Sequence, residues 1–204
     1  VNEYASVREV FEESVAKYGD RPSYTCMGKT LSFDELNTLS AAFGSFLQAN
    51  GCGKGTRVAL MMPNILQYPV CLFGILRAGC TVVNVNPLYT ARELEHQLVD
   101  SGAEVLVVVE NFAHTVQDVI GKTKKLRRVV VTSIGELLGF RGIAVDLAIR
   151  HVKKMVPKWH LPDSIKLSDA LSDGRRRTLQ RIGIGHEDIA FLQYTGGTTG
   201  GAKR

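Results

Sequence analysis

The chain has 204 residues, 45% hydrophobic and 22% charged, and its mean hydropathy is +0.01. This length suffices for a complete hydrophobic core, and the composition is that of a globular protein rather than a disordered or fibrous one. The formal net charge is +5, and the strongest apolar stretch, residues 58–85, is interrupted by prolines, polar residues and Arg77. A membrane-spanning helix of about 20 apolar residues is therefore not predicted.

The excess of basic side chains lies in residues 121–204. No helix-turn-helix, zinc or RNP pattern accompanies them, so we predict no nucleic-acid partner and favour a phosphorylated ligand or anionic lipid. The basic side chains form three clusters: Lys122, Lys124, Lys125, Arg127 and Arg128; Arg150, Lys153, Lys154 and Lys158; and Arg175, Arg176, Arg177 and Arg181.

Neither the cysteines nor the histidines are spaced as metal ligands. Four cysteines occur at 26, 52, 71 and 80 without a CxxC pair, and no signal-peptide pattern precedes them. We therefore expect a cytoplasmic compartment. The five histidines form no HExxH motif, and the GxSxG turn of serine hydrolases is missing. The oligomeric state is left open.

The first elements are marked by helix-capping patterns. Capping boxes at Ser6-x-x-Glu9, Ser32-x-x-Glu35 and Thr90-x-x-Glu93 predict three helices that end near the glycines at 19, 51 and 102. Residues 23–31, between the first two helices, are typical of a small hairpin that turns at Gly28-Lys29.

A regular alternation of strands and helices follows. Continuous apolar runs at residues 105–109 and 129–131 indicate strands covered on both faces. The alternation predicts an α/β fold, a layered parallel sheet flanked by helices with right-handed crossovers. Pro69 suggests that its helix begins close to it. We expect strands at 57–62, 81–85, 104–109 and 128–132, and helices at 65–78, 91–101 and 112–122.

Residues 140–160 interrupt this alternation with a basic amphipathic helix. Apolar residues recur at helical spacing from Phe140 to Val152, and the Arg150 cluster accompanies them before Trp159. One interpretation is an ordinary helix packed on the sheet with a solvated basic face. The other is a helix that lies on an anionic membrane surface.

The last predicted strand, residues 188–194, leads into a glycine-rich loop, Tyr194-Thr-Gly-Gly-Thr-Thr-Gly-Gly-Ala-Lys203-Arg204. Glycines allow the backbone to approach an anion closely, and successive N–H groups, hydroxyls and Lys203 suit a polyphosphate. The spacing matches neither the Walker A motif nor GxGxxG. The loop therefore indicates a phosphate site at the end of a strand.

The order of residues in this loop resembles the phosphate-binding signature of the adenylate-forming ligases. Several further segments resemble the bacterial long-chain fatty acyl-CoA ligases within that superfamily. These segments are residues 58–69, 74–79, 82–90, 92–98 and 156–162. The family motif continues Lys-Gly, whereas Arg204 follows Lys203 here; either the exit of the loop differs from the pattern, or Arg204 is an edge of the sequenced piece, which we favour.

The resemblance implies that ATP activates a long-chain fatty acid as an acyl-adenylate, which CoA then converts to a thioester, with Mg²⁺ as cofactor. It also implies that residues 1–204 are the N-terminal part of an AMP-binding domain. The adenine pocket, acidic metal ligand, acyl tunnel and C-terminal catalytic lysine would then lie beyond Arg204, and the fragment alone would be inactive. The alternatives are a ligase for another carboxylic acid and a non-catalytic module that binds nucleotide or a membrane surface.

The resemblance assigns roles within the loop. Lys203 would neutralise charge in catalysis, and Thr198 would contact a phosphate or Mg²⁺. The residues implied in nucleotide binding are Tyr194, Thr195, Gly196, Gly197, Thr198, Thr199, Gly200, Gly201 and Lys203.

Overall fold

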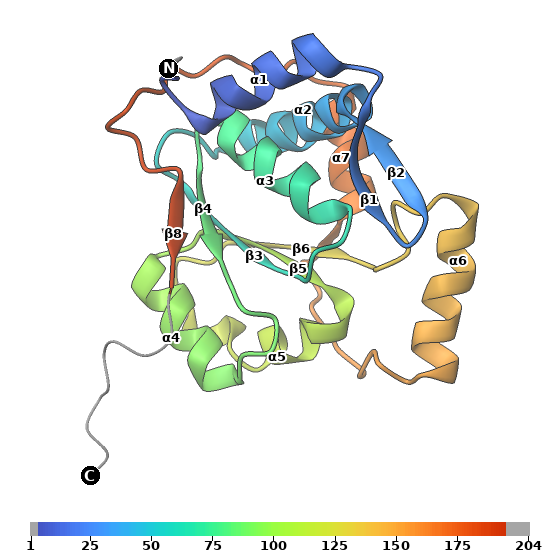
Figure 1. Cartoon of the computed structure of the whole chain (residues 1–204). Helices are drawn as coiled ribbons and strands as arrows, with labels where there is room; N and C mark the ends of the chain where they lie inside the picture. The colour runs from blue at the N-terminus through green and yellow to red at the C-terminus, as the bar shows by residue number, and fades with distance from the viewer. Residues whose placement is uncertain (1–3, 195–204) are drawn as a thin grey trace.

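A computed structural model describes residues 4–194, which are built around one six-stranded sheet (Figure 1). The strand order is β7-β6-β5-β3-β4-β8, and every neighbouring pair is parallel. The predicted α/β fold with a parallel sheet is thereby confirmed. The strands are β3 (Arg57–Met61), β4 (Thr81–Asn84), β5 (Val105–Val109), β6 (Arg128–Thr132), β7 (Ile165–Lys166) and β8 (Phe191–Gln193).

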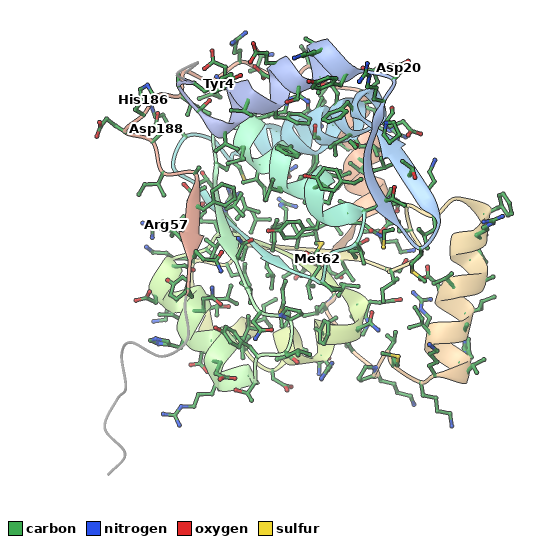
Figure 2. All side chains as sticks on the ribbon, in the orientation of Figure 1. Tyr4, Asp20, Arg57, Met62, His186 and Asp188 are labelled. Carbon is green, nitrogen blue, oxygen red and sulfur yellow. The ribbon has the colours of Figure 1, made fainter. Side chains whose placement is uncertain are left out.

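Helices cover both faces of this sheet, and side chains fill the space between the layers (Figure 2). Strand β5 is buried on both faces and therefore consists of an unbroken apolar run. Val105, Val107 and Val109 join the core on one face, and Leu106 and Val108 join the core on the other. One face carries α1 (Val7–Tyr18), α2 (Phe33–Ala49), α3 (Gln67–Arg77) and α7 (Leu167–Arg175); the other carries α4 (Ala91–Ser101) and α5 (Ala113–Gln117).

The predicted capping patterns are complete at two of three helices. Ser32 and Glu35 bond reciprocally at the start of α2, as Thr90 and Glu93 do at α4. At α1 the Ser6 hydroxyl accepts from the Glu9 N–H, but the Glu9 carboxylate accepts from Ala5 instead of Ser6. That box is half formed.

The hairpin consists of β1 (Pro22–Cys26) and β2 (Lys29–Ser32), and it turns one residue earlier than predicted. Met27 and Gly28 occupy the turn with φ of 49° and 76°. Positive φ at both central residues is the geometry of a type I′ turn, which matches the twist of paired strands.

Other boundaries differ modestly from the predictions. Helix α3 begins at Gln67, so Pro69 lies in its first turn, as expected. The helix predicted over 112–122 is divided into η1 (Glu110–Phe112), α5 and η2 (Ile120–Lys122). Several β-branched residues and Gly121 lower helix propensity there. Strand β7 and helix α7 had no clear signal in the sequence.

A helix is present at α6 (Phe140–Leu147), and it continues as the π-helical turn η3 (Ala148–Val152). Phe140, Ile143 and Leu147 are exposed, whereas Val145 is partly buried and packs against the core. The helix therefore contacts the body of the protein, as the first interpretation expects, but most of its apolar stripe faces solvent, which that interpretation does not predict.

Candidate functional site

A groove of about 270 Å³ lies where β3, β4 and β8 end. Open parallel sheets bind ligands beyond the carboxyl ends of their strands. The groove therefore lies where the fold places a ligand, and it adjoins the residue from which the glycine-rich loop begins. Its lining is Leu60, Met62, Asn64, Tyr68, Asn84, Val85, Asn86, Tyr89, Gln193 and Tyr194.

Strand β8 reaches this groove from the far end of the chain by pairing with β4. The N–H of Val82 donates to the carbonyl of Ala190 at 2.9 Å, and the Thr81 hydroxyl donates to the carbonyl of Ile189 at 2.9 Å. An ion pair of 2.9 Å between Lys54 and Asp188 adds a contact just before the strand. These long-range contacts place Tyr194 beside the end of β4.

A chain of hydrogen bonds crosses the groove through Asn84. The Tyr68 hydroxyl donates to Asn84 Oδ1 at 2.8 Å, and Asn84 Nδ2 donates to Gln193 Oε1 at 2.8 Å. The backbone carbonyl of Asn84 accepts from Gln97 Nε2 at 2.7 Å. Burial raises the pKa of the Tyr68 phenol, so this group stays a neutral donor. One side chain thus ties helix α3 to the ends of β4 and β8.

Tyr194 is fixed by a second contact on the other face of the sheet. Its hydroxyl donates to the Asp100 carboxylate of α4 at 2.5 Å. Burial, followed by this bond to Asp100, raises the pKa of Tyr194 to about 12. The phenol is therefore neutral at physiological pH and acts as a donor. Its contact with the carboxylate is a charge-assisted hydrogen bond.

The segment between β4 and α4 forms a compact turn at the groove. Asn86 Oδ1 accepts from the Leu88 N–H at 3.0 Å, and the Asn86 carbonyl accepts from the Tyr89 N–H at 3.1 Å. The capping box at Thr90 begins the helix directly afterwards, and bonds from the Thr90 N–H and hydroxyl lower the pKa of Glu93. The turn holds Asn86 and Tyr89 at the rim.

The side chains that line the groove are all uncharged. They offer amides and phenols, which can orient a polar ligand but cannot neutralise an anion. Of the loop residues implied by the resemblance, Tyr194 lies at this groove; Thr195, Gly196, Gly197, Thr198, Thr199, Gly200, Gly201 and Lys203 lie outside the described residues. The assignment of these residues to the nucleotide stays a prediction.

Sequence reasoning missed the groups that position this groove. Asn84, Gln193 and Asp100 received no role, although Asn84 ends a buried strand and Asn86 follows it closely. Polar residues at the carboxyl end of such a strand are a usable signal. Their partners, by contrast, depend on contacts across about half of the chain.

Within residues 4–194, no helix is long and apolar enough to cross a bilayer. The same part of the chain contains no group of three or more His, Cys, Asp or Glu side chains arranged to hold a metal ion.

A family model described as AMP-binding enzyme matches residues 11–204. The chain belongs to the AMP-binding enzyme family. Among curated members, a long-chain-fatty-acid–CoA ligase of Escherichia coli O6:H1 is 53% identical over 98% of this chain, and one of Haemophilus influenzae is 50% identical over 99%. The ligase of the same description from Bacillus subtilis is 32% identical over 97%. The resemblance to bacterial long-chain ligases is thereby confirmed.

The chain spans 36% of the length of the Escherichia coli and Haemophilus relatives. Solved structures of CoA ligases share its fold. An anthranilate CoA ligase in complex with anthranoyl-AMP superposes with a TM-score of 0.77 at 20% identity, covering 98% of this chain and 34% of that one. A long-chain-fatty-acid–CoA ligase from Archaeoglobus fulgidus superposes with a TM-score of 0.71 at 24% identity, covering 98% of this chain and 36% of that one.

Proposed function

We propose that the protein to which this chain belongs activates long-chain fatty acids as CoA thioesters at the expense of ATP. The observation that carries the proposal is the identity of 50–53% to long-chain-fatty-acid–CoA ligases over nearly the whole chain. The groove beside Tyr194 supports it, because it lies at the strand ends from which the glycine-rich loop continues.

The reaction would proceed in two balanced steps. The fatty acid carboxylate attacks the α-phosphorus of ATP and forms an acyl-phosphate anhydride, and pyrophosphate leaves. The CoA thiol then attacks the acyl carbon, loses its proton and expels AMP. Both partners in the first step are anions, so positive charge and oriented N–H groups lower the barrier.

Within this scheme the loop would hold the departing phosphates. Lys203 would neutralise their charge, and the glycines would let backbone N–H groups approach them. Tyr194 would bound the site. The phosphate ligands would be Thr195, Gly196, Gly197, Thr198, Thr199, Gly200, Gly201 and Lys203.

The described groove does not fit Mg²⁺ by itself. Mg²⁺ favours carboxylates, phosphates and water, whereas the lining side chains are uncharged. The metal would depend on the phosphates of ATP, with Thr198 as a hydroxyl ligand in the loop. The described residues instead position the end of β8 through Asn84 and Tyr194.

ATP–pyrophosphate exchange by the full-length protein tests the proposal. Exchange should require a carboxylic acid and should be fastest with long-chain fatty acids. Replacing Lys203 with Ala should slow it by about 100-fold or more, since loss of one such electrostatic donor costs about 2.7–4 kcal/mol. If no carboxylic acid supports exchange, the ligase proposal is wrong and a non-catalytic nucleotide module remains.

A ligase for another carboxylic acid is the second candidate. A curated hydroxybenzoate–CoA ligase of Thauera aromatica is 25% identical over 91% of the chain, half the identity to the long-chain ligases. The long-chain acid is therefore favoured. Faster exchange with benzoate derivatives than with long-chain acids would reverse this preference.

We further propose that the protein is cytoplasmic and associates peripherally with the anionic inner face of the membrane. The support is the basic cluster that follows α6. Arg150 is paired with the buried carboxylate of Glu110 at 2.5 Å, which leaves Lys153, Lys154 and Lys158 exposed for lipid headgroups. Each is worth about 1 kcal/mol near an anionic surface. Replacing the three lysines with Ala should reduce the fraction of protein that sediments with anionic vesicles, and salt should weaken the binding of this variant less than that of the wild type.

A further inference from the structure

Helix α6 carries its apolar stripe on the side that faces solvent. Phe140 is 85% exposed, Ile143 68% and Leu147 53%, and Ala144 between them is also exposed. Positions i, i+3, i+4 and i+7 share one face of a helix. Val152, in η3, is a further apolar side chain that is 79% exposed. We call Phe140, Ile143, Ala144 and Leu147 the outer face of α6.

The opposite side of α6 is held to the protein by polar contacts. Asp146 accepts hydrogen bonds from the Ser133 hydroxyl at 2.6 Å and from the Gly135 N–H at 2.8 Å. The backbone of Gly142 lies directly against that of Gly135, where a side chain at either residue would clash. Val145 also packs against the core on this inward side. The helix is therefore held by Gly142, Val145 and Asp146, while the larger apolar side chains of its outer face stay outside.

Further contacts prevent the helix from rolling its apolar stripe inward. In η3, Arg150 makes two hydrogen bonds with the carboxylate of Glu110, which is 4% exposed. Beyond η3, Asn111 Nδ2 donates to the carbonyl of Met155 at 3.0 Å. Removing Arg150 from Glu110 would leave a buried charge without a partner, which is costly. The outer face is thus built to remain outside.

The chemistry around the outer face matches an anionic lipid surface. Arg141, Lys153, Lys154 and Lys158 are exposed on the same segment. Apolar side chains flanked by Lys and Arg are the composition of helices that lie in the membrane interface. Figure 2 shows side chains of α6 standing clear of the rest of the molecule.

Helix α6 lies far from the point at which the described chain ends. Strand β8, from which the chain leads into residues 195–204, lies at one edge of the sheet, whereas α6 follows β6, on the side of β7 at the other edge. Figure 1 shows α6 and β8 on opposite sides of the molecule.

We propose that the outer face of α6 inserts into the headgroup and acyl boundary of an anionic bilayer and docks the protein there. This inference rests on the proposed peripheral location and adds its mode: apolar insertion by one helix face, with the lysines providing attraction at longer range. Asp146 and Arg150 fix the orientation of the helix from the protein side.

The test uses the full-length protein with the substitutions F140S and I143S together. Vesicles of phosphatidylglycerol and phosphatidylethanolamine are compared with vesicles of phosphatidylcholine by sedimentation. The double variant should bind the anionic vesicles at least about tenfold more weakly, since burying even one such side chain contributes about that factor. The matched control is M27S and V99S, which removes exposed apolar side chains elsewhere and should leave vesicle binding unchanged.

Thermal unfolding without vesicles shows whether the outer face of α6 is covered by another segment of the protein instead of by lipid. The F140S and I143S variant should unfold at the wild-type temperature; a fall as large as that of a core substitution would mean that another segment covers the face and would overturn the proposal. Vesicle affinity equal to wild type would overturn it as well. Exchange activity with a water-soluble carboxylic acid, without vesicles, reports on the ligase proposal separately and should be unchanged in this variant.

Discussion

The hydrogen bond from Tyr194 to Asp100 joins the start of the glycine-rich loop to helix α4. We predict that Tyr194→Phe, which removes only the hydroxyl, weakens ATP binding by the full-length protein. A hydrogen bond to a charged group contributes about 1.5–3 kcal/mol. Asp100 is exposed, so we take the lower value, which corresponds to about tenfold. The KM for ATP should rise by up to that factor, because the end of β8 is less often docked.

The assay is ATP–pyrophosphate exchange at saturating fatty acid, with KM and kcat measured separately. Asp100→Ala should reproduce the effect of Tyr194→Phe, and the double variant should be no worse than either single variant, because one contact is removed in each case. Tyr24→Phe is the control, since this exposed phenol lies in β1 and does not line the groove. Additive effects of the two single variants, or an unchanged KM, would refute the reasoning.

The same contact predicts that the free energy of unfolding falls at alkaline pH. The folded state raises the pKa of Tyr194 from 10.0 to about 12, so it favours the neutral phenol. This stabilisation is complete below pH 10 and is lost as the pH rises towards 12. Denaturant unfolding of wild type and Tyr194→Phe should therefore converge over this interval. A constant difference in unfolding free energy would contradict the prediction.

Three further predictions concern other parts of the structure. Asn84→Ala removes two side-chain hydrogen bonds at the groove and should lower the unfolding free energy by about 1–2 kcal/mol, measured in urea. Arg150→Met leaves the buried Glu110 without its cation and should destabilise by about 2 kcal/mol, less than for a fully buried pair, because Arg150 is half exposed; unchanged stability would contradict this. Burial raises the pKa of Cys80 to about 12, so iodoacetamide should modify it far more slowly than the less buried Cys26, as peptide mass spectrometry would show.

The sequence by itself determined the features that depend on near neighbours. The capping boxes at Ser32 and Thr90 formed as predicted, because their partners are three residues away. The valine run of β5 predicted a strand covered on both faces, since alternate side chains point to opposite sides of a sheet. The family resemblance likewise came from contiguous segments. The prediction of secondary structure was weakest where helix formers are mixed with β-branched residues, as around α5.

Tertiary structure decided what long-range pairing and burial control. Gln193 meets Asn84 across 109 residues and Tyr194 meets Asp100 across 94, and no local pattern specifies either contact. Helical spacing revealed the stripe of α6 but not its direction. That direction was set by the close approach of Gly142 to Gly135, by the bonds of Asp146 and by the packing of Val145 on the core, which leave Phe140, Ile143 and Leu147 outside. Periodicity identifies which side chains share a face, whereas only the packing of distant segments determines what that face contacts.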